Sequence, residues 1–239
     1  QIQSRGLGDV YKRQVLIVVV LFCWNVLANL VIPDLGAVPV AISGMVVLIV
    51  LARRAGAGWS SLGLGRASLG AGTRLGGIAF FIVTAGVVIA ALIPPLREFL
   101  GDDRFIGVEL GEMLYETLLR IPIGTALGEE LAFRGVLFGV LLAWFSPLRA
   151  ALISSALFGL WHVLPGIEAL ETTTVPGLAS GLLGALSVTV QVIVTAGVGM
   201  VFCWLRFRSG SIIAPVLAHW AINGAAFVVG WLIVENGWI

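Results

Sequence analysis

The sequence predicts an all-α protein, a polytopic transmembrane bundle of about seven to eight helical spans in one domain. Three observations predict this fold class. Hydrophobic residues make up 59% of the 239 residues and charged residues only 11%, whereas a soluble domain carries about 25% charged residues. The apolar residues form long runs, and the few charges fall between these runs with alternating sign. The net charge of +1 gives no electrostatic reason to expect nucleic acid as a partner.

Each expected span is an apolar run, because a helix needs about 20 such residues to cross the hydrocarbon core. We expect spans near residues 15–32, 38–52, 75–94, 121–145, 148–163, 182–205 and 212–234. The second and fifth runs are short enough to be re-entrant. The fourth has room to begin near Leu110, with a break at Pro122. Residues 55–74 are too polar to span, so we expect a loop there with Trp59 at the membrane interface.

The first fourteen residues differ from everything that follows. They are polar and basic, and the string SRGLGDVYKRQ resembles a translated sequencing adaptor. We therefore predict that residues 1–14 are a non-native extension and that residues 15–239 form the single transmembrane domain. On this interpretation the native N-terminus is missing. A helix lost there, or a split fourth span, would account for an eighth span.

The charges between the spans alternate from loop to loop. The basic loops contain Arg53, Arg54, Arg66, Arg74, Arg149, Arg206 and Arg208, and the loops between them are mainly acidic. Positive residues mark the cytoplasmic side of a membrane protein. We therefore expect a multi-pass protein of a bacterial or archaeal cell membrane, with its C-terminus facing outward.

Four glycines of the fourth span predict a close helix contact. At 100° per residue, Gly124, Gly128, Gly135 and Gly139 fall within about 60° of one another on an ideal helix. Glycine on one face lets a neighbouring segment approach closely. We expect this face to serve packing rather than chemistry.

Three polar clusters lie inside the apolar spans. They are Glu129, Glu130 and Arg134 in the fourth span, His162 at the end of the fifth, and His219 with Asn223 in the seventh. Glu130 and Arg134 are four residues apart and can pair along one helix face. Because an unpaired buried carboxylate is costly, we interpret them as a structural pair. Glu129 points about 100° away from Glu130, which leaves it free to face a cavity.

These residue types suit the activation of water. A carboxylate can accept a proton from water, and a neutral histidine can orient that water. Histidine with asparagine can donate hydrogen bonds to a developing oxyanion. Glu129, His162, His219 and Asn223 are therefore candidate catalytic residues, and Phe158, one turn before His162, would form a wall of the cavity.

The histidines also raise two further expectations. Glu129, His162 and His219 could coordinate zinc from three helices, although the sequence contains no HExxH pattern. The use of Zn is left open. His219 lies near the basic end of its span and His162 near the acidic end of its own, so bringing them together requires a tilted or re-entrant helix.

The order and spacing of these motifs resemble those of a known protein family. EExxxR at residues 129–134, FxxxH at 158–162 and HxxxN at 219–223 lie on separate expected helices. Together they resemble the CPBP family, the CAAX-protease and bacteriocin-processing proteins that are also called Abi. The resemblance implies an intramembrane endopeptidase that cuts membrane-tethered peptides or proteins, including prenylated CAAX-type substrates.

The resemblance also implies a role for each matching residue. Glu129 would activate the water, His162 would help to position it, and His219 with Asn223 would stabilise the oxyanion. The buried ion pair would support the site. The family is commonly labelled a metalloprotease, and a glutamate-dependent mechanism without a catalytic metal has also been argued.

Two other functions remain as alternatives. A non-proteolytic family member would keep this fold and act as a membrane scaffold or a bacteriocin-immunity protein. A proton-coupled transporter would use the buried glutamate and histidines as a proton path. Transporters usually contain internal repeats, and we find none in the sequence, so we rank the transporter last. Membrane lipid and a membrane-tethered substrate are the expected partners, and the oligomeric state is left open.

Overall fold

The computed structural model describes residues 7–30, 37–98, 100–101, 103–171 and 181–238, and these residues form helices and connecting loops without a β-strand. The helices are α1 (Leu7–Leu30), α2 (Ala37–Arg54), η2 (Arg66–Ser68), α3 (Leu69–Ala91), α4 (Pro94–Arg97), η3 (Asp103–Phe105), α5 (Leu110–Tyr115), η4 (Glu116–Leu127), α6 (Gly128–Glu130), η5 (Leu131–Leu137), α7 (Phe138–Leu141), α8 (Pro147–Trp161), α9 (Val163–Glu171), α10 (Gly181–Ser209) and α11 (Ile213–Glu235). The predicted all-α class is confirmed for the described part of the chain.

Four helical stretches of the described residues are long and apolar enough to cross a membrane. They are Arg66–Ala91, Pro147–Leu170, Gly181–Ser209 and Ile213–Glu235. Their outward surfaces are rich in exposed large hydrophobic side chains, such as Phe81, Ile82 and Ile193. In water such surfaces would be unfavourable, so they are the surfaces that lipid would cover.

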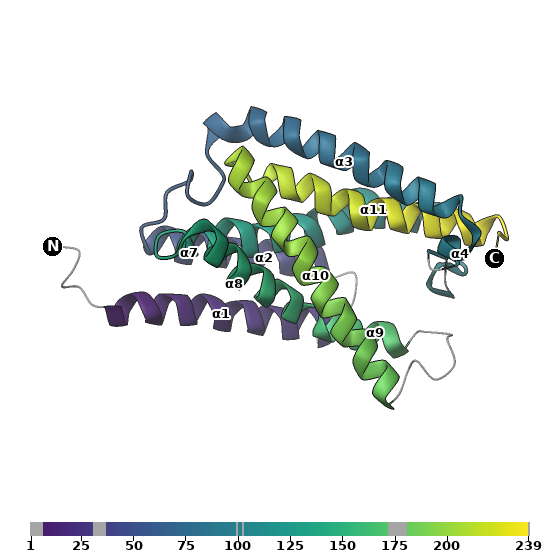
Figure 1. Cartoon of the computed structure of the whole chain (residues 1–239), viewed down its shortest axis with the longest axis horizontal. Coiled ribbons are helices and arrows are strands. Elements are labelled where there is room, and N and C mark those ends of the chain that lie inside the picture. The colour runs from purple at the N-terminus through teal and green to yellow at the C-terminus, as the bar shows by residue number, and fades with distance from the viewer. Residues whose placement is uncertain (1–6, 31–36, 99, 102, 172–180, 239) are drawn as a thin grey trace.

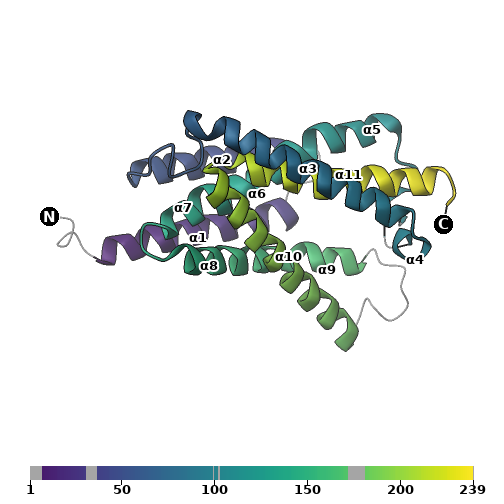
Figure 2. The same cartoon turned by 45° about the horizontal axis from the view of Figure 1, so that its top comes forward.

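Among the helices that the structure describes, α3 and α11 make the most extensive contact. In Figures 1 and 2, α3 and α11 run side by side in the same direction along the long axis, and α10 crosses them obliquely. A Cβ atom at Gly76 of α3 would lie 2.8 Å from the Cα of Ala214. The two backbones therefore approach as closely as they do because position 76 has no side chain.

The basic loops meet at one end of the bundle, around residues 55–65. Arg206, near the end of α10, donates a hydrogen bond from Nη2 to the carbonyl of Ser61 at 2.9 Å. The N–H of Ile212, just before α11, donates to the carbonyl of Gly63 at 3.0 Å. At the end of α2, the guanidinium of Arg53 lies 4.8 Å from the ring centre of Trp59. We call this region, where α2, α10 and α11 meet that loop, the basic end.

The helical stretch from Leu110 to Leu141 differs from the prediction. No break occurs at Pro122, which lies inside η4. Both η4 and η5 are π-helical and flank the single turn of α6. The wider π turn accommodates a proline ring and its missing N–H without ending the helix, and such turns often occur at functional sites.

Three other boundaries differ from those predicted. Residues 69–74, which we expected in a loop, form the first turns of α3. Apolar runs mark only the hydrocarbon core, and a helix can continue into the interface beyond it. The fifth span continues past residue 163 as α9. Helix α1 begins at Leu7, within residues 1–14, and the non-native origin of that segment stays a prediction.

The glycine face of the fourth span packs as predicted. Gly124 lies against Val38 of α2, and Gly128 lies against Trp24 of α1 and Ala41 of α2. Gly135 and Gly139 lie against the backbone of residues 61–62. A Cβ atom at Gly139 would lie 2.6 Å from the carbonyl oxygen of Ser61. The glycines therefore let α2 and the following loop approach the helix that carries the polar cluster.

Candidate functional site

The structure brings Glu129, His162 and His219 together from three separate helical segments. Glu129 lies on α6, between the two π-helical segments. His162 occupies the junction of α8 and α9, and His219 lies about two turns into α11. The Nε2 atoms of both histidines are 4.0 Å from Oε2 of Glu129. The site therefore gathers one carboxylate and two imidazoles whose positions in the sequence are up to ninety residues apart.

The orientation of each imidazole is set by its other nitrogen. Nδ1 of His162 lies 2.8 Å from the carbonyl oxygen of Phe158, and Nδ1 of His219 lies 2.9 Å from Oε1 of Glu130. A carbonyl oxygen and a carboxylate oxygen can only accept. Both Nδ1 atoms must therefore carry the proton. In the neutral imidazoles the Nε2 lone pairs then face Glu129.

Oε2 of Glu129 and the Nε2 atoms of the two neutral histidines are all hydrogen-bond acceptors. Oε2 of Glu129 is buried and has no hydrogen-bond partner among the described residues. Facing lone pairs repel one another unless a proton donor or a cation lies between them. A single oxygen atom can lie about 2.8 Å from each of two atoms that are 4.0 Å apart. The geometry therefore suits a water molecule that donates to Glu129.

Glu130 and Arg134 form the ion pair that their spacing predicts. Oε1 of Glu130 lies 3.1 Å from Nη1 of Arg134, and both side chains are 0% exposed. The same oxygen also accepts the hydrogen bond from Nδ1 of His219. Oε2 of Glu130 and two nitrogens of Arg134 have no hydrogen-bond partner among the described residues. The pair therefore compensates charge without saturating every atom, and it also orients His219.

Aromatic rings surround the polar atoms. The ring of Phe158 lies 4.7 Å from that of His162 and 6.1 Å from that of His219, between centroids. The guanidinium of Arg134 lies 4.0 Å from the centre of the Phe158 ring, within the range of a cation–π contact. Phe202 of α10 stacks on His219 at 5.3 Å. Phe158 thus lies beside both histidines, as the sequence predicts, whereas no sequence signal identified Phe202.

Trp161 is a second residue that the sequence analysis missed. Its Nε1–H donates to Oε1 of Glu129 at 3.1 Å. Its ring packs edge-on against Trp24 and Phe133, and its carbonyl accepts a hydrogen bond from Nδ2 of Asn25 at 3.0 Å. Trp161 therefore holds the Glu129 carboxylate by one oxygen and leaves the other toward the histidines. Its position directly before His162 was the signal that could have identified it.

Asn223 is the candidate with the fewest contacts. It lies one turn beyond His219 on α11 and is partly buried. Its amide makes no hydrogen bond to any residue that the structure describes. The N–H₂ group is therefore available as a neutral donor on the face of α11 that carries His219.

The residue types of Glu129, His162 and His219 suit zinc, but the distances between their donor atoms do not. Two imidazole nitrogens and a carboxylate are ligands that zinc prefers, and each histidine has the Nδ1 hydrogen bond typical of a metal ligand. Tetrahedral zinc at its usual bond lengths places ligand atoms about 3.3 Å apart, whereas both N···O separations are 4.0 Å. Over the described ranges, no group of three or more His, Cys, Asp or Glu side chains has the spacing to hold a metal ion. As placed, the three side chains do not close around zinc.

Comparison with known proteins identifies one family. Residues 112–225 match the family model described as type II CAAX prenyl endopeptidase, Rce1-like. The matched segment includes all three motifs, and the match confirms the predicted family. No curated protein matches the chain, and no solved structure matches it.

Proposed function

From the membership of residues 112–225 in the Rce1-like family of type II CAAX prenyl endopeptidases, we propose that this chain is an intramembrane endopeptidase that uses water activated by Glu129. The observation that carries the proposal is the convergence of Glu129 Oε2 with two Nε2 lone pairs. A proton acceptor held by one oxygen, beside two oriented imidazoles and inside an apolar bundle, is the arrangement that hydrolysis needs.

In the proposed reaction each proton has a defined place. Glu129 accepts a proton from the water that it shares with His162, and the remaining hydroxide forms a bond to the carbonyl carbon of the scissile peptide. The proton on Glu129 then moves to the departing amine as the C–N bond breaks. The products are a carboxylic acid and an amine, so water is the only co-reactant.

The oxyanion formed in that step needs hydrogen-bond donors. Asn223 offers a neutral amide on the face of α11 that carries His219. His219 can donate from Nε2 only in the form that carries a proton there, and the contact of its Nδ1 with Oε1 of Glu130 at 2.9 Å orients its ring. Both residues are proposed as oxyanion donors.

We propose a membrane-associated substrate, of the prenylated CAAX type. A cavity of about 510 Å³ lies beside Trp161, between α1 and the α8–α9 segment. Its lining is apolar and includes Leu21, Phe22, Leu160 and Leu164. An apolar tail in this cavity would bring the attached peptide close to Glu129, which Trp161 contacts directly.

The proposed setting is a cell membrane of a bacterium or archaeon, crossed seven to eight times. The four apolar stretches already described are joined by α1, α2 and the stretch from Leu110 to Leu141. Each of these three lies between loops of opposite charge in the predicted topology. Labelling of single cysteines introduced into successive loops of the intact protein would give the number of spans.

The proposed activity is tested with purified protein in detergent and a fluorescent prenylated CAAX peptide. We expect cleavage of this peptide, slower cleavage of its unprenylated form, and none by Glu129→Gln. Glu168→Gln, which removes an exposed carboxylate of α9, is the matched control and should keep full activity. Full turnover by Glu129→Gln would overturn the role of Glu129. A folded wild-type protein that cleaves neither peptide would favour the scaffold or immunity alternative.

A separate measurement decides the use of metal. Because the two N···O separations are wider than zinc requires, we expect the active protein to contain less than one zinc per chain and to tolerate chelators. Stoichiometric zinc whose removal abolishes cleavage and whose return restores it would contradict this part of the proposal.

A further inference from the structure

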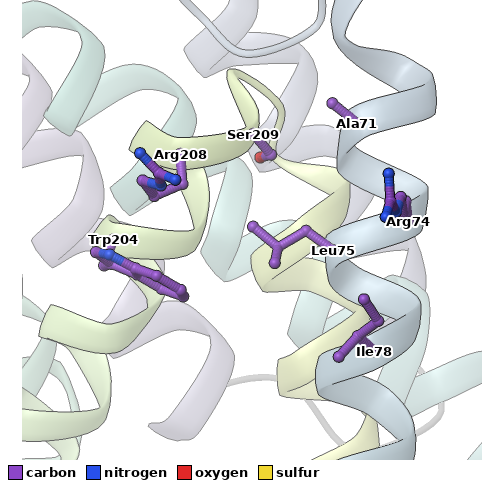
Figure 3. A pocket seen from close by; sticks show the side chains of 7 residues that line it. All are labelled: Ala71, Arg74, Leu75, Ile78, Trp204, Arg208 and Ser209. Atoms are coloured by element: carbon purple, nitrogen blue, oxygen red, sulfur yellow. The ribbon is translucent and has the colours of Figure 1, made fainter.

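At the basic end, a crevice opens between α3 and α10, away from the polar cluster. We propose that it binds one anionic phospholipid, with the phosphate held between Arg74 and Arg208. The crevice has a volume of about 370 Å³. Figure 3 shows Arg208 and Trp204 on α10 and Arg74, Leu75 and Ile78 on α3, with α11 between and behind the two helices. The two cations thus come from opposite walls of one cavity.

The charge of these two arginines is not compensated by the protein. Residues 52–75 and 204–214, which form the basic end and both walls of the crevice there, contain no aspartate or glutamate. Both side chains are exposed, and neither forms an ion pair with a residue in the described ranges. Arg206, two residues before Arg208, differs because it is buried and donates to the carbonyl of Ser61. Arg74 and Arg208 therefore remain available to an anion from outside.

The apolar part of the crevice favours a lipid over a soluble anion. Leu75, Ile78 and Trp204 line it below the arginines, and Ile78 and Trp204 are half exposed. Arg74 and Trp204 each lie about 7.5 Å along the axis from the nearer end of their helix, and tryptophan is enriched at membrane interfaces. An acyl chain can follow the apolar walls while its phosphate stays at the surface. A free phosphate ion would contact none of these walls.

The chemistry of arginine suits a phosphate at this position. A guanidinium presents parallel N–H donors that match phosphate oxygens, and long side chains near a helix end reach to the interface. Basic pockets between transmembrane helices on the positive side bind anionic headgroups in this way. Ala71, one turn before Leu75, adds only a methyl group to the crevice, which leaves space for the headgroup.

Native mass spectrometry of the full chain in detergent tests the proposal, with phosphatidylglycerol and phosphatidylcholine as probes. We expect one phosphatidylglycerol per chain and weaker retention of phosphatidylcholine. Each arginine should contribute about fivefold, so Arg74→Gln with Arg208→Gln should weaken phosphatidylglycerol binding about 25-fold. The matched control is Arg54→Gln with Arg149→Gln, which removes two exposed arginines that do not line the crevice.

A third variant separates a cavity from a charged surface. Ala71→Trp fills the crevice and keeps both arginines, and we expect it to lose the bound lipid. Equal weakening by the control pair, or full retention by Ala71→Trp, would overturn the site and leave only diffuse attraction to a basic surface. Displacement of the lipid by millimolar inorganic phosphate would overturn the choice of occupant. Because retained lipid is counted directly, the result does not depend on peptide cleavage.

Discussion

The two halves of the polar cluster differ although Glu129 and Glu130 are adjacent in the chain. Glu130 is 0% exposed, pairs with Arg134 and accepts a hydrogen bond from His219, so its charge is compensated within the protein. Glu129 is held through one oxygen by Trp161, and its other oxygen faces two nitrogen lone pairs. A buried charge that supports a fold needs its partners in place. A buried charge that reacts must keep one side open to the reactant, and this difference separates the two glutamates.

The largest expected effect comes from replacing Glu129, the glutamate that keeps one oxygen open to the reactant. Glu129→Gln keeps the shape of the side chain and the acceptor for Trp161 but cannot take a proton from water. We expect kcat for the prenylated peptide to fall about a hundred- to ten-thousand-fold, the usual contribution of a general base. The thermal unfolding midpoint should change little. If Glu129→Gln unfolds instead, Glu129 supports the fold as Glu130 does.

The next largest effect is expected from breaking the buried ion pair of Glu130 and Arg134. Arg134→Ala strands the carboxylate of Glu130 and should lower stability by about 3–5 kcal/mol. His219→Ala leaves the ion pair intact and should reduce folded yield much less. Size-exclusion profiles and thermal unfolding of the two variants measure the difference. Equal losses in both would contradict the division of the cluster.

A double variant sharpens the same comparison. Glu130→Leu with Arg134→Met replaces both charges by apolar side chains of similar size, and we expect it to recover most of the folded yield. Activity should stay low because His219 loses the acceptor that orients its ring. Recovery of both yield and kcat would show that Glu130 has no positioning role.

A smaller effect is expected at Trp161. Trp161→Phe removes the N–H that holds Glu129 and keeps most of the ring that packs against Trp24 and Phe133. A hydrogen bond to a charged group contributes about 1.5–3 kcal/mol, so kcat should fall about ten- to a hundredfold. Trp144→Phe, at an exposed position, is the control. If both variants were fully active, the carboxylate would not depend on this contact.

The smallest effect is expected at a second ion pair on the same helical stretch. Arg120 and Glu116 have the same i, i+4 spacing and lie 2.8 Å apart, but their side chains are 31% and 11% exposed. Water screens such a pair, so Arg120→Gln should cost about 1 kcal/mol or less and leave kcat unchanged. A loss as large as that of Arg134→Ala would show that burial does not set the difference.

Much of the site follows from local spacing. The Glu130–Arg134 pair and the contact of Phe158 with His162 both join residues one turn apart, and a helix places such residues together whatever surrounds it. Trp161 and Phe202 could not be identified in this way. A tryptophan or phenylalanine in an apolar helix has the same sequence signal whether it touches lipid, the core or a carboxylate.

The sequence by itself determined the all-α class, the membrane environment, the family and most helix positions, because these depend on composition, hydropathy and short-range periodicity. Only the tertiary structure decided that the Nε2 atoms of His162 and His219 both lie 4.0 Å from Oε2 of Glu129. It alone also decided that Arg74 and Arg208 line the same crevice. The widening of the fourth helix around Pro122 also appeared only there. These features depend on the angles and depths at which distant helices pack, and the packing of a whole bundle sets those quantities rather than any one segment.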